Sequence, residues 1–154
     1  MTDLMACVKE FHDALRVAET RAFPTEVDER LNAIGHLLVS ISQHLEASIS
    51  EPSGRHLRAH LTLEETGEWL LALSAGDEEK ALDALADRLY VLVGDAVMYD
   101  LPLIEAFIEV HRSNMTKKRA LHDEGRVRDK GDEFVPPDLR SILKTYRFKK
   151  GYSL

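Results

Sequence analysis

Cysteine is nearly absent: Cys7 is the only one, so the chain cannot form an internal disulfide. A single free thiol fits a reducing compartment, and we expect Cys7 to be a small core residue rather than a nucleophile. Long apolar runs are missing too, because the longest, from Leu89 to Tyr99, is interrupted by Asp95 and is too short to cross a bilayer. Residues 1–5 lack the basic region of a signal peptide. We therefore expect a cytoplasmic protein with no membrane partner.

Positive charge is also in short supply. The chain has 20 lysines and arginines against 27 aspartates and glutamates, a formal net charge of −7. This balance argues against general nucleic-acid binding, and the basic residues near the C-terminus belong to no nucleic-acid-binding motif. With 154 residues, 44% of them apolar and 31% charged, the composition is typical of one soluble globular domain, which we expect over residues 1–154.

Strand-like alternation is absent, and apolar residues recur instead at helical spacing. We expect an all-α helical bundle of four to five main helices with a C-terminal loop and a short helix. The main helices are predicted over residues 3–17, 26–47, 55–74, 78–99 and 103–117, the loop over 120–137, and the short helix from 137 or 138 to 145. The helix over 78–99 is apolar on nearly all sides after Leu89, so we expect it to be central and the most buried. Gly67, inside a helix, predicts close approach of a neighbour.

Three glutamates stand out on the helix predicted over 55–74. Each helical residue advances about 100° around the axis. With Leu57 at zero, Glu64 falls at about −20° and Glu68 at about +20°, along the apolar stripe that continues to Leu71. Glu65 falls at about +80°, on the edge of that stripe. Carboxylates that face a core are costly unless a cation compensates them, and carboxylates one turn apart repel each other.

The next helix supplies two more acids. Asp83 and Asp87 are four residues apart and therefore share one helix face. The two sets together predict a divalent metal held between two helices. An oxygen-only ligand set, with no histidine or cysteine nearby, suits Mg²⁺, with Mn²⁺ as an alternative.

Three blocks resemble the all-α nucleoside triphosphate pyrophosphohydrolases, which include the MazG, dimeric dUTPase and phosphoribosyl-ATP pyrophosphohydrolase groups. The blocks are residues 63–68 (LEETGE), 83–91 (DALADRLYV) and 109–117 (EVHRSNMTK), with a weaker match at 123–127 and 134–138. The chain looks most like the MazG-like proteins with dUTPase-type activity. Residues 19–52 look longer than the corresponding part of those relatives, so the resemblance assigns nothing there.

The resemblance implies hydrolysis between the α- and β-phosphates of a nucleoside triphosphate, such as dUTP or a non-standard nucleotide, giving a monophosphate and pyrophosphate. Phosphoribosyl-ATP stays open as an alternative substrate. The family pattern is Glu-Glu-x-x-Glu on one helix and Glu-x-x-Asp on the next. It implies Glu64, Glu68 and Asp87 as metal ligands. Ala84 occupies the position of the family glutamate, so Asp83 is the nearest substitute and the number of metal ions stays open.

The residues themselves favour the same class of chemistry. A triphosphate needs cations to screen its charge, and a metal-bound water is acidic enough to attack it. We assign Glu65 as the general base, because it lies at the edge of the stripe beside the ligands.

Substrate contacts are expected mainly from the third block and the loop after it. We assign Asn114, Lys117 and Lys118 to phosphate or nucleotide binding, since lysine acts as a mobile point charge. His111 joins this set, with a structural hydrogen bond as its alternative, and Phe134 is a candidate contact to the base. Arg58 is expected either to contact phosphate or to pair with an acid.

Two other readings stay open. A non-catalytic helical module would use the same surface for protein association. A di-iron carboxylate bundle would need Glu-x-x-His on each of two helices, and the sequence contains none. We expect a homodimer or homotetramer, because the family it resembles is built that way and the helices are strongly apolar.

Overall fold

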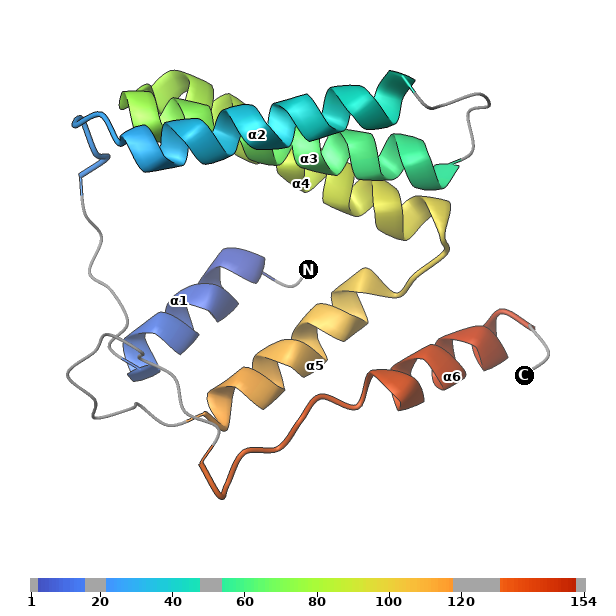
Figure 1. The fold of residues 1–154 in the computed structure, drawn as a ribbon. Helices are drawn as coiled ribbons and strands as arrows, with labels where there is room; N and C mark the ends of the chain where they lie inside the picture. The colour runs from blue at the N-terminus through green and yellow to red at the C-terminus, as the bar shows by residue number, and fades with distance from the viewer. Residues whose placement is uncertain (1–2, 16–21, 48–53, 118–130, 152–154) are drawn as a thin grey trace. The chain divides into compact units, whose positions relative to one another are not determined.

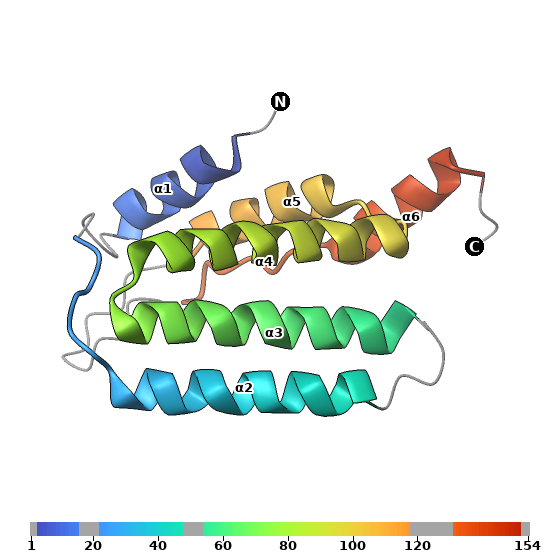
Figure 2. The ribbon, with the colours of Figure 1, turned by 90° about the horizontal axis from the view of Figure 1, so that it is seen from above.

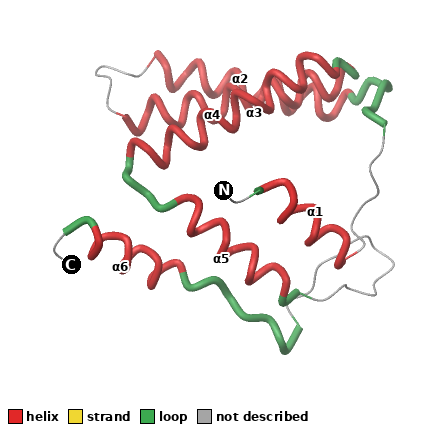
Figure 3. Tube along the Cα trace, turned by 180° about the vertical axis from the view of Figure 1, so that it is seen from behind, coloured by secondary structure: helices red, strands yellow, loops and turns green. Residues whose placement is uncertain are grey.

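The computed structural model describes residues 3–15, 22–47, 54–117 and 131–151. This part of the chain contains helices and no strand, as Figures 1 and 3 show, so the all-α prediction is confirmed. The helices are α1 (Leu4–Leu15), α2 (Glu29–Ala47), α3 (Gly54–Ala75), α4 (Glu78–Met98), α5 (Leu103–Met115) and α6 (Leu139–Lys149). None of the described helices combines the length and apolarity that a membrane crossing requires.

The chain divides into two compact units. One consists of Ala22–Asp100 and contains α2, α3 and α4; the other consists of Met1–Arg21 and Leu101–Leu154 and contains α1, α5 and α6. A single domain over residues 1–154 stays a prediction.

In the first unit α3 lies between α2 and α4 and packs along both (Figure 2). The α2–α3 contact is closest at a pair of glycines. A Cβ atom added to Gly67 would lie 2.8 Å from Cγ2 of Val39 and 3.0 Å from the carbonyl oxygen of Gly35. A Cβ added to Gly35 would lie 2.8 Å from Cγ of Leu71. The close approach predicted from Gly67 is therefore confirmed.

Aspartate caps set where α2 and α4 begin. Asp28 Oδ1 accepts hydrogen bonds from the backbone N–H groups of Arg30 and Leu31, at 3.0 and 3.1 Å, so α2 starts at Glu29 rather than at residue 26. Asp77 Oδ1 accepts from the N–H of Lys80 at 3.1 Å. These side chains satisfy backbone donors that the first turn of a helix leaves unpaired.

The expectation that α4 is the central, most buried helix is wrong. The helix buries only a small-residue face against its neighbours, with Ala84 at 4% exposure and Val91 at 8%. Most of its large apolar side chains are exposed, among them Leu89 at 54%, Tyr90 at 83% and Val97 at 76%. Because α3 takes the central place, α4 has one packed side, and apolarity around its whole circumference did not mean burial on all sides.

The second unit pairs α5 with α1 and with α6. Phe11 of α1 is buried, at 6% exposure, whereas Cys7 is half-buried. The α6 helix begins after Asp138, whose Oδ1 accepts from the N–H of Ser141 at 3.0 Å, and it ends four residues later than predicted. The backbone N–H of Asp138 donates to Glu109 Oε1 of α5 at 2.8 Å. Glu109 therefore fixes the start of α6 on α5.

Candidate active site

The predicted acids lie around a helix with two packed sides. On the scale used above, Gly67 meets α2 at about −80° and Arg58 meets α4 at about +100°, so the packed sides are nearly opposite. Glu64 and Glu68 point between the two neighbours, and Glu65 lies on the side that faces α4. The carboxylates were expected on a single apolar stripe. A helix packed between two others has two packed sides instead, so that expectation does not hold.

Glu65 is the acid that α3 and α4 enclose. Its Oε2 atom is buried and has no hydrogen-bond partner among the described residues. Glu68 is exposed instead, and Glu64 has a side chain 34% exposed. The expectation that Glu64 and Glu68 face the core while Glu65 lies on its edge is therefore wrong. An unsatisfied buried carboxylate oxygen is costly, so this atom needs a proton or a cation as its partner.

The five predicted acids lie close enough for their charges to act on Glu65 and Glu68. Burial raises the pKa of Glu65 above its usual 4.5, and the negative charges of Asp87, Glu68, Glu64 and Asp83 raise it further, in that order. Burial likewise raises the pKa of Glu68, followed by the charges of Glu64, Asp87 and Asp83. The acids of α3 and α4 thus form one cluster of uncompensated negative charge, although Asp83 and Asp87 are exposed.

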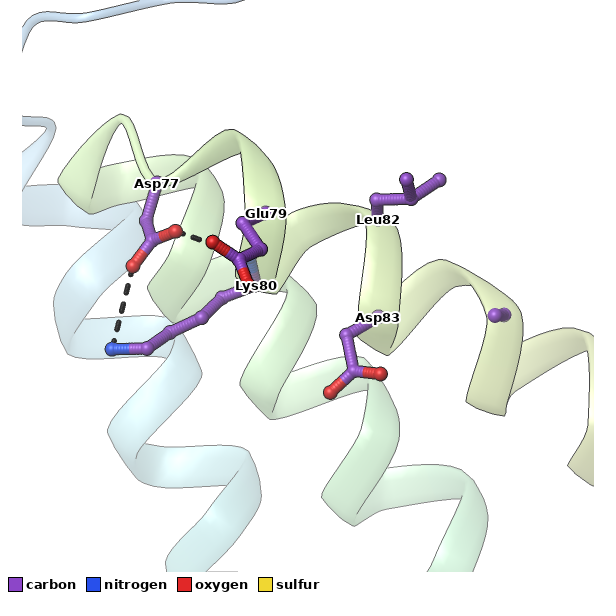
Figure 4. A pocket seen from close by; sticks show the side chains of 6 residues that line it. Asp77, Glu79, Lys80, Leu82 and Asp83 are labelled. Carbon is purple, nitrogen blue, oxygen red and sulfur yellow. Dashed lines mark hydrogen bonds and ion pairs between the residues drawn. The ribbon is translucent and has the colours of Figure 1, made fainter.

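The two basic residues of α4, Lys80 and Arg88, contact other groups. Lys80 Nζ lies 3.3 Å from Asp77 Oδ2, and the guanidinium of Arg88 lies over the ring of Trp69, 4.7 Å from its centroid. Figure 4 shows the Lys80 side chain extended toward Asp77, with Asp83 on the next turn of α4. The negative charge of Asp83 and Asp87 is therefore available to a mobile cation.

The chemistry of the cluster fits a hard divalent cation, but its side chains are not assembled around one. Within the described ranges, no three histidine, cysteine, aspartate or glutamate side chains form a group that could hold a metal ion. Carboxylate oxygens are the ligands that Mg²⁺ prefers, and the unpartnered Oε2 of Glu65 shows that the cluster lacks compensating positive charge. Binding would therefore require side chains of the cluster to rotate.

The structure shows where residue 84 lies, which is an alanine here and a glutamate in the family pattern. Ala84 is 4% exposed, so the position of the family glutamate lies on the packed side of α4. Asp83, one residue earlier, points to a different, exposed side and is the last of the charges that raise the pKa values of Glu65 and Glu68. Asp83 therefore belongs to the cluster without taking the place that a residue 84 acid would hold.

Two open hollows share Asp77, Lys80 and Asp83 in their linings. The first, of about 540 Å³, runs along the start of α4 and is drawn in Figure 4. The second, of about 480 Å³, combines apolar residues of α3 with polar residues of α2, α3 and the start of α4. It is lined by His36, Glu68, Leu71, Ala72, Ala75, Asp77, Lys80 and Asp83. A hollow of this size beside a carboxylate cluster is large enough for part of a nucleotide.

His60 lies beside the acid cluster and was not among the residues predicted from the sequence. His60 is buried, at 6% exposure; its Nδ1 lies 3.0 Å from the Ser42 carbonyl oxygen and its Nε2 lies 3.4 Å from Glu64 Oε2. The expectation that no histidine lies near the acids is therefore wrong. The signal was present in the sequence, because residues four apart share a helix face.

Arg58 joins α3 to α4. Its Nε lies 2.5 Å from Asp95 Oδ1, and its Nη2 donates to the carbonyl oxygen of Val91. Gly94 leaves room for the guanidinium, because a Cβ atom there would lie 2.9 Å from Arg58 Nη2. Of the two roles expected for Arg58, the structure places it in the pairing with an acid.

The third sequence block brings three predicted substrate contacts together. Lys117 Nζ lies 2.6 Å from Asn114 Oδ1 and 6.0 Å from the ring centroid of Phe134. His111 Nε2 lies 3.2 Å from Glu10 Oε2 of α1, which is the structural role given as its alternative. Lys118 lies outside the described residues.

Comparison with known proteins gives one match. A model of the phosphoribosyl-ATP pyrophosphohydrolase family matches residues 8–114, well over half of the chain. The matched stretch contains all five acids of the cluster, His60 and Asn114. No curated protein and no solved structure matches the chain.

Proposed function

The chain belongs to the phosphoribosyl-ATP pyrophosphohydrolase family, and from this premise we propose that it is a Mg²⁺-dependent hydrolase that cleaves the α–β phosphate bond of a nucleotide. This family is one of the groups that the three sequence blocks resemble, so the resemblance to the wider superfamily is confirmed. The proposed substrate is a nucleoside triphosphate such as dUTP or a non-standard nucleotide. The family match favours phosphoribosyl-ATP as the second candidate.

The observation that carries the proposal is the uncompensated charge between α3 and α4. The charges of the neighbouring acids raise the pKa values of Glu65 and Glu68, and Glu65 has a buried, unpartnered oxygen. Natural folds retain such an arrangement mainly where a ligand compensates it. A magnesium-bound polyphosphate supplies the cation that the acids lack.

Each acid has a proposed role. Glu64, Glu68 and Asp87 would hold the metal, with Asp83 as an additional ligand. When bound, the metal would screen the phosphate charge and lower the pKa of a water molecule. Glu65 would accept the proton of that water, because its unpartnered Oε2 is an acceptor and its raised pKa brings its proton affinity closer to neutrality.

The substrate contacts come from the third block. Lys117 would bind phosphate as a point charge, and its hydrogen bond to Asn114 would orient the ammonium group. The ring of Phe134, near the same ammonium, would contact the base.

The exposed apolar side of α4 supports self-association as a homodimer or homotetramer. Leu89, Leu92 and Val97 are each more than half exposed, and contiguous apolar surfaces on soluble proteins usually mark an interface. Light scattering at micromolar concentration tests this, and a monomeric mass would contradict it. A non-catalytic association module would give the same mass, so the mass alone does not test catalysis.

The decisive experiment presents the purified protein with Mg²⁺ and a panel of nucleotides, including dUTP, other triphosphates and phosphoribosyl-ATP. The products are resolved by chromatography. Release of a monophosphate with pyrophosphate, dependent on Mg²⁺ and lost in EDTA, is the expected result. Release of orthophosphate, or no turnover of any member of the panel, would contradict the proposed bond cleavage.

A further inference from the structure

We propose that His60 is a positioning residue that ties the carboxylate of Glu64 to the backbone of α2 and thereby prepares Glu64 for metal binding. The inference rests on the proposed function, because it takes Glu64 as a metal ligand. It also gives α2 a role, although α2 belongs to the segment to which the sequence resemblance assigns nothing.

One end of the imidazole is anchored. The ring is 6% exposed, and its Nδ1 lies 3.0 Å from the carbonyl oxygen of Ser42. A carbonyl oxygen only accepts hydrogen bonds, so Nδ1 carries a hydrogen and donates it. Ser42 is itself fully buried, and its Oγ donates to the Val39 carbonyl oxygen at 2.9 Å. The ring is therefore held by a rigid stretch of helix backbone rather than by a mobile side chain.

The other end of the imidazole faces the acid cluster. Nε2 lies 3.4 Å from Glu64 Oε2, one helical turn further along α3, and this contact is attractive when the ring carries a second hydrogen, on Nε2. The Glu64 side chain is about one-third exposed and points between two helices. A contact to an anchored ring restricts its rotamers, which is what the outer partner of a metal-binding carboxylate does.

The spacing of small residues explains why the anchor is within reach. Gly35 and Ser42 are seven residues apart on α2, and Gly67 and His60 are seven residues apart on α3. Seven residues are about two helical turns, so each pair lies on one side of its helix. The glycines bring the two backbones together, and two turns away the same seam places the Ser42 carbonyl against the His60 ring. The α2–α3 seam thus fixes the distance over which His60 acts.

The experiment uses two substitutions that each preserve one end of the imidazole. The amide nitrogen of asparagine overlies Nδ1, so His60→Asn keeps the donor to Ser42 and loses the contact to Glu64. The amide nitrogen of glutamine overlies Nε2, so His60→Gln keeps a hydrogen-bonding group at the contact to Glu64. His44→Asn is the matched control, because His44 of α2 is exposed and its Nδ1 lies 2.8 Å from the Ser40 carbonyl oxygen in the same kind of contact.

The main readout is Mn²⁺ binding to the metal-free, full-length protein, measured by calorimetry without substrate. We expect His60→Asn to weaken Mn²⁺ binding about tenfold or more, His60→Gln to weaken it less, and His44→Asn to leave it unchanged. Circular dichroism confirms that each variant is folded. In turnover assays, His60→Asn should raise the Mg²⁺ concentration needed for half-maximal rate while retaining kcat at saturating Mg²⁺, a split that a merely structural role would not produce.

A measurement on the unchanged protein covers the case in which a His60 variant does not fold. In nitrogen-15 imidazole spectra, Mg²⁺ should shift the Nε2 signal of His60 and leave that of His44 in place. Equal Mn²⁺ affinity in wild type and folded His60→Asn, or a His60 signal unmoved by bound Mg²⁺, would overturn the inference while leaving the proposed function intact. Wild-type protein that binds no divalent ion would overturn the proposed function and, with it, the role of His60.

Discussion

Arg58 and Asp95 join α3 to α4 through a contact of 2.5 Å between Nε and Oδ1, with the arginine side chain 15% exposed. Arg58 was one of the residues expected to meet either phosphate or an acid, and the two roles make different predictions for its removal. Because both side chains are partly buried, the pair holds two helices together at the end of α3 remote from Glu68.

Arg58→Ala should therefore lower stability and leave substrate affinity unchanged. The loss of charge-assisted hydrogen bonds to Asp95 and Val91 is expected to reduce the free energy of unfolding by about 1.5–3 kcal/mol. Urea unfolding measures this, and KM at saturating Mg²⁺ tests the phosphate role. Lys80→Ala is the control, since its side chain is 79% exposed and its removal should change stability little. A large rise in KM with unchanged stability would restore Arg58 to the substrate.

Gly67→Ala should destabilise the protein although alanine favours helix. The new Cβ would lie 2.8 Å from Val39 Cγ2 and 3.0 Å from the Gly35 carbonyl oxygen, and backbone cannot yield cheaply. Overpacking of about 1–3 kcal/mol would outweigh the gain in helix propensity of about 1 kcal/mol. Gly54→Ala is the matched control in the same helix, because the new Cβ would meet only the flexible Met98 side chain. Thermal unfolding of both variants decides; equal melting temperatures would contradict the tight seam.

Glu65→Gln should stabilise the metal-free protein at neutral pH. The pKa of Glu65 is raised above 4.5, so the folded state holds this proton more tightly than the unfolded state, and rising pH above 4.5 destabilises the fold. Glutamine carries no charge, so the substitution removes this loss of stability. In EDTA, the melting temperature of Glu65→Gln should exceed that of wild type at pH 7, and the difference should shrink toward pH 4.5. Glu46→Gln, on the exposed side of α2, should show neither effect.

Glu68→Ala and Asp87→Ala should each abolish turnover without changing helix content. Both residues are exposed, so their loss leaves no cavity, and each contributes negative charge to the cluster that would hold the metal. Product assays and circular dichroism make the test, with Glu46→Ala as a control for removing an exposed glutamate. Activity that survives both substitutions would remove these acids from the metal site.

The attachment of α6 should loosen in acid. Hydrogen bonds from the Arg112 side chain and from the backbone N–H of Asp138 hold the pKa of Glu109 down to about 2, against a usual 4.5. A lowered pKa means that the contribution of Glu109 is complete above pH 4.5 and is lost as pH falls toward 2. The hydrogen-exchange protection factors of residues 139–149, taken relative to the intrinsic exchange rate at each pH, should therefore fall over that interval. Glu109→Gln should show fast exchange already at pH 7; protection that stays constant down to pH 2 would contradict this anchor.

The helices themselves could be read from the sequence almost to their ends. Apolar spacing located every one, but α2 begins at Glu29 rather than at residue 26, because the Asp28 carboxylate caps two N–H groups. The contents of the acid cluster were also predictable, since residues four apart share a face.

The surroundings of each acid were not predictable, because they depend on which neighbours a helix packs against. One apolar stripe was assumed for α3, whereas it contacts α2 and α4 on nearly opposite sides, and this exchanges the environments of Glu65 and Glu68. For the same reason α4 packs on one side within its own unit. The contact of His60 with Glu64 follows from their spacing of four residues, but its anchor, the Ser42 carbonyl, belongs to another helix and leaves no trace in the pattern around residue 60.

The glycine seam between α2 and α3 also fixes how far the two helices can slide along each other. An axial slip of one turn, about 5.4 Å, would bring Leu31 or Val39 opposite Gly67 in place of Gly35, and neither side chain fits against a neighbouring backbone. Axial shifts of less than one turn are excluded because they would break the hydrogen bond between His60 Nδ1 and the Ser42 carbonyl oxygen. The two helices therefore have a single axial register. Any insertion within either helix that shifts this register should abolish the function of the acid cluster without replacing any of its acids.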